Sequence, residues 1–174
     1  MLAAGSSSRF RDGHKLVASF RGRPLVVWAV QSAIAAALDE VVVVTGGQAL
    51  RLPWGARVVV NPLASAGQAT SLQAALRACV RHDAVVVGLG DQPLVPPESW
   101  RAVAAGGSPI AVATYRGRRR NPVRLDRTIW PLLPVTGDEG ARVLMRARPD
   151  LVAEVPCAGD SADIDTLEDL KRWS

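Results

Sequence analysis

The sequence predicts one Rossmann-like α/β domain over residues 1–174, built on a doubly wound, mostly parallel sheet. Short runs of β-branched residues alternate with helix-length segments, which is the order of βαβ units. With 174 residues, 48% of them hydrophobic, the chain can bury one well-packed core, and no repeat or low-complexity linker divides it. We therefore expect a single domain.

The expected core strands are apolar along almost their whole length. Continuous apolar runs, unlike alternating ones, are typical of parallel strands covered by helices on both faces. Such runs occur at residues 41–45, 57–60, 84–89 and 110–114. Two less regular strands are expected further on, an edge strand at 121–125 and another strand at 151–155.

Helices are expected between these strands. Residues 25–38 form a nearly all-apolar helical segment, and residues 139–148 read as a second helix. A closing helix should begin near Thr166, whose hydroxyl can cap it while Asp169 lies three residues on, a variant of the capping box. Another helix shows one apolar face at helical spacing, made of Leu72, Ala75, Leu76, Cys79 and Val80.

Composition excludes several classes of protein. The longest apolar run, residues 24–38, is interrupted by Gln31 and Ser32 and is shorter than the ~20 residues of a membrane span. No secretory leader pattern opens the sequence, so we expect a cytoplasmic protein without membrane contacts. Cys79 and Cys157 lack metal-ligand spacing and are expected to be reduced thiols.

The basic charge has three candidate uses. A net charge of +5 and a pI near 10.2 suit nucleic acid, a membrane surface or a phosphate-rich small substrate. A nucleic-acid-binding module rests mainly on the arginine-rich run 116–120, and sparse aromatic residues argue against it. Nearly all the charge comes from arginine, because Lys15 and Lys171 are the only lysines. Lys15 therefore calls for a specific explanation.

The segment Leu2-Ala3-Ala4-Gly5-Ser6-Ser7-Ser8-Arg9 has the composition of a phosphate-binding loop. Small residues after a strand end let backbone N–H groups approach phosphate oxygens. Arg9 adds a planar fork of donors and Lys15 a compact charge, the pairing expected around a triphosphate. The loop matches neither the dinucleotide fingerprint nor the Walker A pattern. A flexible turn with two solvated bases is the alternative.

Five short motifs, taken in order, resemble the signature of the MobA/MocA-like nucleotidyltransferases. They are the loop at residues 2–9 with Lys15-Leu16, then residues 67–72, 90–94, 137–142 and 163–170. The resemblance extends over essentially the whole chain. It is closest to the molybdenum cofactor cytidylyltransferases, because Ala3-Ala4-Gly5 stands where guanylyltransferases usually have Ala-Gly-Gly. It implies a fold of the nucleotide-diphospho-sugar transferase (GT-A-like) type and transfer of CMP from CTP to molybdopterin, with release of pyrophosphate.

Asp91 is the first candidate metal ligand. It follows the expected strand 84–89, at the edge of an open α/β sheet where ligands bind, and there it could hold Mg²⁺ against phosphate oxygens. The alternative is a turn residue before Pro93. Asp163 and Asp165, two positions apart, could complete the metal site, or form a solvated pair at a helix N-terminus. Three carboxylates repel one another unless a cation lies between them, so replacing Asp91 by Asn should relieve repulsion.

Contacts to the nucleotide are implied by the resemblance. They come from Leu2, Ala3, Ala4, Gly5, Ser6, Gly67 and Ser71. From the residues alone, Thr70 or Ser71 is more simply the N-cap of the helix that follows.

Contacts to the acceptor are less defined. The resemblance places Arg142 beside the acceptor pocket, whereas a surface ion pair is its simpler role. The run 116–120 could receive an anionic acceptor or be a solvated loop. Asn121 stands before Pro122 where the cytidylyltransferase branch often has His, which leaves the acceptor's identity open.

The implied reaction is an in-line attack by an acceptor oxygen on the α-phosphorus, in which Arg9, Lys15 and Asp91 act by positioning and charge neutralisation. Neither histidine has a nucleophilic partner in the sequence, as expected for this chemistry. Alternatives are a guanylyltransferase, a sugar-phosphate nucleotidyltransferase, and a non-catalytic chaperone that hands molybdopterin to an enzyme. A molybdoenzyme or its maturation factor is therefore an expected partner.

The first strand is expected to be short. Members of the family usually begin this strand several residues before Leu-Ala-Ala-Gly, whereas Met1 here takes a strand position. The sequence therefore raises the expectation of a start upstream of Met1.

Overall fold

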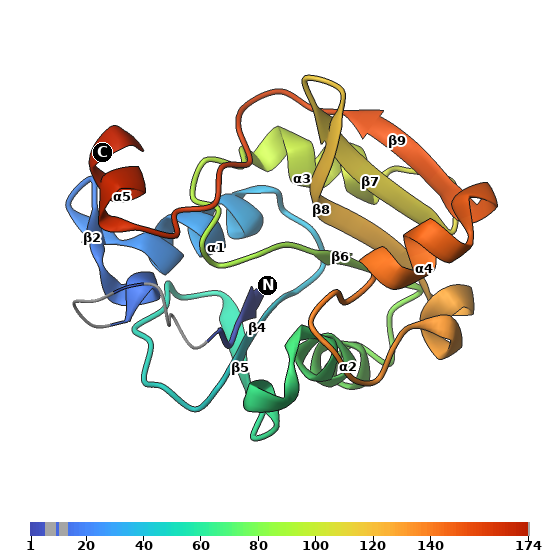
Figure 1. Ribbon diagram of the computed structural model, residues 1–174, viewed down its shortest axis with the longest axis horizontal. Coiled ribbons are helices and arrows are strands. Elements are labelled where there is room, and N and C mark those ends of the chain that lie inside the picture. The colour runs from blue at the N-terminus through green and yellow to red at the C-terminus, as the bar shows by residue number, and fades with distance from the viewer. Residues whose placement is uncertain (6–9, 11–13, 174) are drawn as a thin grey trace.

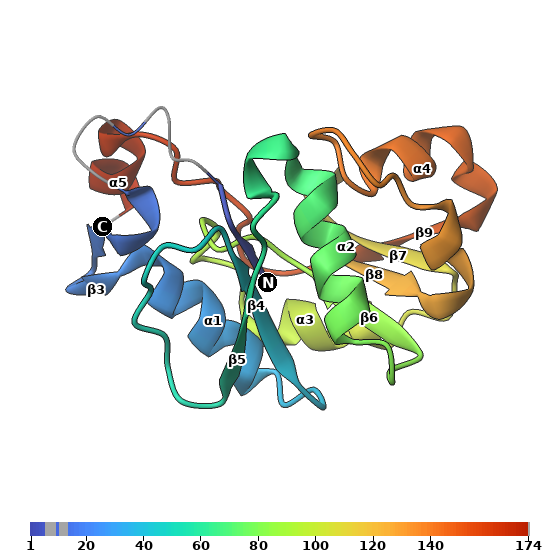
Figure 2. The ribbon, with the colours of Figure 1, turned by 90° about the horizontal axis from the view of Figure 1, so that it is seen from below.

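The computed structural model describes residues 1–5, 10 and 14–173. Helices cover both faces of a central sheet (Figures 1 and 2). The strands are β1 Leu2–Ala3, β2 Ser19–Phe20, β3 Arg23–Pro24, β4 Val41–Thr45, β5 Ala56–Val60, β6 Ala84–Val87, β7 Ile110–Tyr115, β8 Arg118–Asp126 and β9 Val152–Pro156. The α-helices are α1 Leu25–Ala35, α2 Gln68–Ala78, α3 Pro97–Ala104, α4 Arg142–Ala147 and α5 Leu167–Trp173, with short 3₁₀ turns at η1 Lys15–Val17, η2 Ala64–Ala66, η3 Arg127–Leu132 and η4 Pro149–Leu151.

The first strand joins the two halves of the sheet. Strands β1, β4 and β5 pair in parallel, and β6, β8, β7 and β9 form the other half. The Leu2 N–H donates to the Gly88 carbonyl at 2.8 Å, and the Gly90 N–H donates to the Leu2 carbonyl at 2.9 Å. The order across the sheet is therefore β5-β4-β1-β6-β8-β7-β9, in which β8 runs against the others. This confirms the doubly wound, mostly parallel sheet.

The expected edge strand at 121–125 is wrong in position, because β8 lies between β6 and β7. Proline is normally excluded from a central strand since it has no N–H to donate. Here the pairing register between β7 and β8 jumps from Val112↔Val123 to Ala113↔Arg120, which leaves Asn121 and Pro122 in a bulge. The pairing of β6 with β8 also stops at Val123. Pro122 therefore lies outside the paired region, and its lack of an N–H removes no hydrogen bond of the sheet.

Strand β5 is the exposed edge of the sheet, although its sequence is as apolar as that of a core strand. Val58 and Val60 are about half exposed, and the strand pairs only with β4 among the described residues. Strand β6 is shorter than expected, because only an isolated bridge at Leu89 continues it beyond Val87. Composition alone did not distinguish these strands from the buried β4 and β7.

The helices largely follow the prediction. Helix α1 ends at Ala35 rather than at residue 38, and Ala37 just beyond it adopts a positive φ of 54°. Helix α5 has the expected cap: the Asp169 N–H donates to Thr166 Oγ1 at 3.1 Å, and the Thr166 N–H donates to Asp169 Oδ2 at 3.0 Å. Helix α4 begins at Arg142, later than expected. Helix α3 was missed, although Pro97 at its first position and Glu98 in its first turn are start signals.

Two cores lie on opposite faces of the sheet. One contains Val26 and Val30 of α1 and Trp100 of α3; the other contains Leu72 and Leu76 of α2 with residues of α4 and the β7–β8 pair. Burying each such side chain stabilises the fold by about 1.5–3 kcal/mol. Cys79 and Cys157 are both free and half-buried, as expected, and burial raises the pKa of each thiol.

Helix α5 packs against the β2–β3 hairpin at one end of the molecule, whereas α4 and β9 lie at the other end (Figures 1 and 2). At the α5 end, Phe20, Leu25 and Ile164 form a small buried cluster that is covered by Trp173 of α5. The C-terminal helix therefore packs against a hairpin from the first part of the chain, whereas the N-terminus lies in the middle of the sheet (Figures 1 and 2). Among the described helices, none combines the length and the apolar character needed to cross a bilayer.

Candidate functional site

A pocket of about 830 Å³ lies where β1, β4 and β6 end. This volume falls within the usual range of small-ligand sites. Its walls come from the carboxyl ends of these parallel strands and from the start of α2, which is where open α/β sheets bind ligands. The residues of the pocket include Leu2, Ala3, Ala4, Gly5, Lys15, Gly67, Ser71, Asp91 and Asp165.

The structure thus brings most of the expected nucleotide contacts together. Leu2 and Ala3 are held in the sheet, and Gln48 Nε2 donates to the Ala3 carbonyl at 2.8 Å. Ala4 and Gly5 lead out of the strand along the pocket wall. The predicted sites Ser6 and Arg9 lie outside the described residues, so their roles remain predictions.

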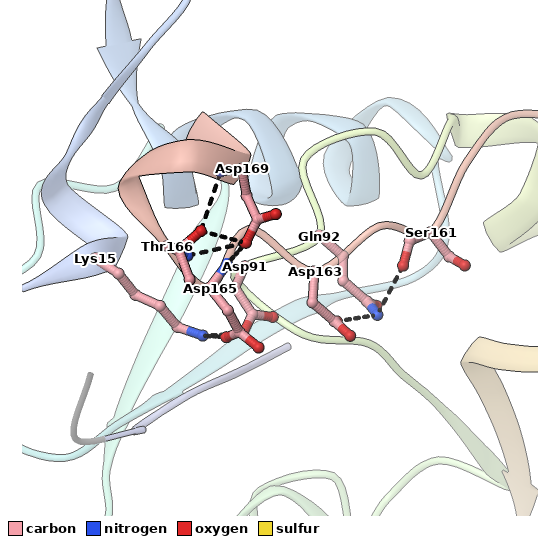
Figure 3. A network of polar contacts seen from close by, with 8 residues as sticks. All are labelled: Lys15, Asp91, Gln92, Ser161, Asp163, Asp165, Thr166 and Asp169. Atoms are coloured by element: carbon pink, nitrogen blue, oxygen red, sulfur yellow. Dashed lines mark hydrogen bonds and ion pairs between the residues drawn. The ribbon is translucent and has the colours of Figure 1, made fainter. Parts of the chain in front are cut away.

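Lys15 lies between two of the three candidate metal ligands (Figure 3). Its Nζ donates to Asp91 Oδ2 at 2.5 Å and to Asp165 Oδ1 at 2.7 Å. The Lys15 and Asp91 side chains are only 14% and 17% exposed, so water screens this pair weakly. Burial opposes the charge of Lys15, but the two carboxylates outweigh it and raise the pKa of Lys15. The cation that relieves carboxylate repulsion here is a lysine of the chain.

Asp163 lies two positions before Asp165 in the same segment and has a different partner. Its Oδ1 accepts a hydrogen bond from Gln92 Nε2 at 2.8 Å, and Gln92 also reaches the Ser161 carbonyl (Figure 3). Partial removal of water, followed by the nearby charge of Asp91, raises the pKa of Asp163. Asp163 is therefore electrostatically coupled to the Lys15 site while its carboxylate bonds to Gln92.

The backbone around Ile164 holds these carboxylates in place. The Ile164 N–H donates to the Asp91 carbonyl at 3.0 Å, which ties the segment to the end of β6. The Ile164 side chain is fully buried against Phe20 and Leu25. Since side chains alternate in an extended segment, Asp163 and Asp165 flank this anchor on the opposite side.

The site has free acceptor capacity for a cation. Among the described residues, Asp91 Oδ1 is buried and has no hydrogen-bond partner, and a buried unpaired carboxylate oxygen is costly. Oxygen ligands of this kind suit Mg²⁺ or Mn²⁺. Within the described part of the chain, however, no three His, Cys, Asp or Glu side chains are grouped so that they could hold a metal ion as they stand. The three-carboxylate site with Asp163 remains a prediction, while the donor set fits a hard divalent cation.

The start of α2 forms the opposite wall of the pocket. The expectation that Thr70 or Ser71 caps this helix is wrong, because Gly67 is the N-cap and no side chain caps it. Thr70 Oγ1 instead lies 2.8 Å from the carbonyl oxygens of Leu63 and Gly67, and buried Asn61 donates to both hydroxyls. Ser71 is thereby held at the pocket wall.

A second cavity of about 290 Å³ adjoins the first and shares Leu2, Gln68 and Leu89 with it. Its apolar surface comes from the core side chains Leu72, Val112, Val123 and Met145. Its polar wall consists of Arg119, Arg120, Asn121, Glu139, Arg142 and Arg146.

Of the arginines expected at the acceptor, Arg119, Arg120 and Arg142 line this cavity, whereas Arg116 and Arg118 do not. Arg116 and Gly117 form the turn between β7 and β8, and the following arginines lie on β8 itself. Glu139 forms its ion pair with Arg146, while Arg142 lines the cavity. Arg119 also donates to Glu154 at 2.8 Å.

Sequence reasoning missed several polar residues of the site. His14, Gln48 and Asp138 line the larger pocket, and Gln92 holds Asp163. Burial, followed by the nearby charge of Lys15, lowers the pKa of His14, whose buried Nδ1 has no hydrogen-bond partner within residues 1–5, 10 and 14–173. Gln92 and Asp138 stand inside motifs that the resemblance had marked, so position in a motif was the signal that could have identified them.

With this strand order and a nucleotide-sized pocket at its carboxyl edge, the molecule has the fold of the nucleotide-diphospho-sugar transferases, as expected. Nucleotidyltransferases form one class of that fold. Residues 1–152 match the family described as the MobA-like NTP transferase domain. The chain belongs to this family of nucleotidyltransferases.

Relatives match nearly the whole chain. A nicotine blue oxidoreductase from Paenarthrobacter nicotinovorans is 32% identical over 190 aligned residues, covering 99% of this chain and 93% of that protein. The purine catabolism protein PucB of Bacillus subtilis (strain 168) is 29% identical, with 97% and 91% covered. The crystal structure of Rv0371c from Mycobacterium tuberculosis H37Rv is similar with a TM-score of 0.83 at 29% identity, over 99% and 93% of the two chains. Rv0371c has also been solved in complex with manganese, with a TM-score of 0.79 at 28% identity and 99% and 94% covered.

Proposed function

We propose that this protein transfers CMP from CTP to molybdopterin in the presence of a divalent cation, Mg²⁺ being favoured, and releases pyrophosphate. The observation that carries the proposal is the adjacency of the two pockets. The larger one has Lys15, Asp91 and Asp165 along one side, and the smaller one combines an apolar floor with arginines. A nucleotide in the first and an anionic, partly apolar acceptor in the second would meet at Leu2 and Leu89, which border both.

The chain's residues would act by positioning and by charge. The backbone of Gly5 and Lys15 Nζ would hold the phosphates. Gly67, Ser71 and the backbone of Leu2 and Ala3 would contact the ribose or base. A divalent cation held by Asp91, Asp163 and Asp165 would neutralise phosphate charge. The acceptor oxygen would form a bond to the α-phosphorus as the bond to the β-phosphate oxygen breaks, and pyrophosphate would leave with that electron pair.

The arginine wall supports an anionic acceptor. Arg120 and Arg142 line the smaller cavity from two different elements, β8 and α4. Planar guanidinium groups bind phosphate through paired hydrogen bonds. Leu72, Val112 and Met145 would pack against the body of the acceptor. This combination suits molybdopterin, and a phosphorylated small acid or sugar phosphate is the alternative acceptor class.

The test is pyrophosphate release with each NTP against a panel of acceptors. CTP with molybdopterin should give the highest turnover, and product mass should equal the acceptor plus CMP. Replacing Asp91 by Asn should lower kcat by about 100-fold or more, because the change removes charge where phosphate charge must be neutralised. Asp39→Asn, at an exposed position, is the matched control and should keep parental turnover. Pyrophosphate release by Asp91→Asn at the parental rate would contradict the role of Asp91.

Nucleotide choice is tested separately by calorimetry. The small residues Ala3, Ala4 and Gly5 at the strand end leave room for a pyrimidine against backbone donors, so CTP should bind more tightly than GTP in the presence of Mg²⁺. Tighter binding of GTP would replace the cytidylyltransferase by a guanylyltransferase without affecting the fold.

A redox activity is the second candidate, because one relative is a nicotine blue oxidoreductase. The loop that follows β1 does not carry the glycine fingerprint of dinucleotide-binding folds. Oxidation of a reduced nicotinamide or flavin should therefore stay at background when a dye acceptor is added. Rapid oxidation without pyrophosphate release from any NTP would favour this second function.

A further inference from the structure

The position of Lys15 has a consequence for the order in which ligands bind. Its ammonium group lies 2.5 Å from Asp91 Oδ2 and 2.7 Å from Asp165 Oδ1, so it bridges two carboxylates that come from distant parts of the chain (Figure 3). A divalent cation that used the same two oxygens would have to take the place of this ammonium. Two cations at one position would repel each other strongly in a site that water screens weakly.

The Lys15 ammonium can take a second position within the same pocket. It is the first residue of η1, and its side chain lines the same pocket as the loop residues Ala4 and Gly5. The backbone of η1 is fixed, since the Ala18 N–H donates to the Lys15 carbonyl at 3.1 Å. A lysine carries its charge on a flexible four-carbon stem, so the ammonium can move within the pocket while the backbone stays in place.

Asp91 and Asp165 are held in place by other contacts. The Ile164 N–H ties the segment of Asp165 to the Asp91 carbonyl, and the Thr166–Asp169 cap fixes the residue that follows. Asp91 Oδ1 is buried and meets no hydrogen-bond partner in the described part of the chain, so the pair offers more acceptor capacity there than Lys15 uses at Asp91. The carboxylates would therefore stay close together after Lys15 leaves.

We propose that Lys15 is a placeholder cation: it occupies the cation position between Asp91 and Asp165 in the nucleotide-free protein and moves to the phosphates when the nucleotide binds. The divalent cation then enters together with the nucleotide and not before it. This inference rests on the proposed nucleotidyltransferase function, and it assigns Lys15 two successive positions in the same site.

The first test measures Mn²⁺ binding to the nucleotide-free protein by electron paramagnetic resonance. The parent should bind Mn²⁺ weakly. Lys15→Met keeps the length of the side chain and removes its charge, so it should bind Mn²⁺ at least tenfold more tightly than the parent. Lys15→Arg keeps the charge and should remain weak, and Lys171→Met, the other lysine of the chain, should behave like the parent. The gain in Lys15→Met should disappear when Asp165→Asn is added.

Mn²⁺ affinity in folded Lys15→Met that is equal to or weaker than that of the parent would overturn the proposal. Circular dichroism checks folding, and Lys15→Gln serves if Lys15→Met does not fold. A second measurement needs no variant: with lysine labelled by ¹³C and ¹⁵N, the chain gives signals from Lys15 and Lys171 only. A CTP analogue with a methylene between the α- and β-phosphates should shift the Lys15 side-chain signals and leave those of Lys171 in place.

Unchanged Lys15 signals at saturating analogue would also overturn the proposal, since Lys15 would then stay on the carboxylates. Failure of the proposed function has a different signature. In that case no acceptor gives pyrophosphate release, while the Mn²⁺ measurements on the nucleotide-free variants still report whether Lys15 occupies the cation position.

Discussion

At the residue scale, the carboxylates of the site differ in what neutralises them. Asp91 and Asp165 are bonded to Lys15, whereas Asp163 accepts a hydrogen bond from the neutral amide of Gln92. Asp91 therefore has a cationic partner within hydrogen-bond distance in a poorly hydrated place, and removing its charge would leave Lys15 less compensated. The relief of repulsion expected from the sequence applies to Asp163 instead, whose pKa is raised by partial removal of water and by Asp91.

The same substitution should thus have opposite effects at two positions. In metal-free buffer at pH 7, Asp91→Asn should lower the stability by about 1–3 kcal/mol, because it breaks the ion pair with Lys15. Asp163→Asn should raise Tm slightly, since Asn can still accept from Gln92 and no longer carries a charge. A carboxyl with a raised pKa costs stability above its ordinary pKa, so this gain should vanish as the pH falls to about 3.

Thermal unfolding of both variants from pH 3 to 8 tests this pair. Asp39→Asn, which is exposed, is the control and should leave Tm unchanged. A rise in Tm for Asp91→Asn in metal-free buffer would show that repulsion among the carboxylates outweighs the ion pair.

At the element scale, the first residues of α2 couple the two pockets. Gly67 caps the helix with a φ of +109°, and the Ala69 N–H donates to the Gly137 carbonyl at 2.9 Å. The loop that begins at Gly137 continues through Asp138 in the larger pocket to Gly140 in the smaller cavity. A Cβ at Gly67 would lie 2.6 Å from the Gly137 carbonyl oxygen, so only glycine permits this close contact.

Gly67→Ala should therefore displace this loop and strain the helix cap. We expect a loss of about 2–3 kcal/mol in urea unfolding, because the positive φ and the steric contact both oppose a side chain. Nucleotide affinity measured by calorimetry should fall as well, since Gly67 lines the pocket. Gly107→Ala is the matched control: a Cβ there meets nothing within 4 Å, so stability should change by no more than about 0.5 kcal/mol. Equal unfolding of the two variants would exclude the tight contact.

At the scale of the whole molecule, β1 connects two half-sheets through very few residues. A cavity of about 500 Å³ lies beneath it, lined by Val41 and Val42 on one side and by residues 84–87 of β6 on the other. The Met1 ammonium donates to the Val42 carbonyl at 2.8 Å, and burial lowers its pKa to about 6. The cavity lies between β4 and β6, where residues added before Met1 could pair with both strands.

The charge of Met1 should make stability depend on pH. An amine whose pKa falls from 8.0 to about 6 on folding binds fewer protons in the folded state, so stability should rise between pH 6 and pH 8. At about pH 6 and below, the buried ammonium should lower the free energy of unfolding by about 2–3 kcal/mol. Urea unfolding at a series of pH values measures it.

Adding four β-branched residues before Met1 should remove this pH dependence and raise Tm, because the new backbone can pair with β4 and β6. A Gly-Ser extension of equal length is the control: it removes the buried ammonium but gains little from strand pairing. If both extensions melt at the same temperature, the cavity does not accept a strand.

The sequence by itself determined most of the order of strands and helices along the chain, though not helix α3, together with the cap at Thr166 and Asp169 and the family. These features depend on residues a few positions apart, so periodicity, capping chemistry and short motifs report them directly. The sequence also predicts that the residues after β1 and β6 lie close together, because parallel strands in one open sheet present their carboxyl ends at one edge. Residues 2–5, Lys15, Asp91 and Asp165 line one pocket at this edge, and their roles toward a nucleotide remain predictions.

The tertiary structure decided what depends on distant segments. Apolar composition does not specify the neighbours of a strand, so the central place of β8 and the exposed edge of β5 emerged only once the chain was folded. Lys15 pairs with carboxylates 76 and 150 positions away, and no local pattern distinguishes a phosphate-binding lysine from one that bridges two aspartates. Such a contact forms only where the packing of the whole sheet brings three chain segments to one point.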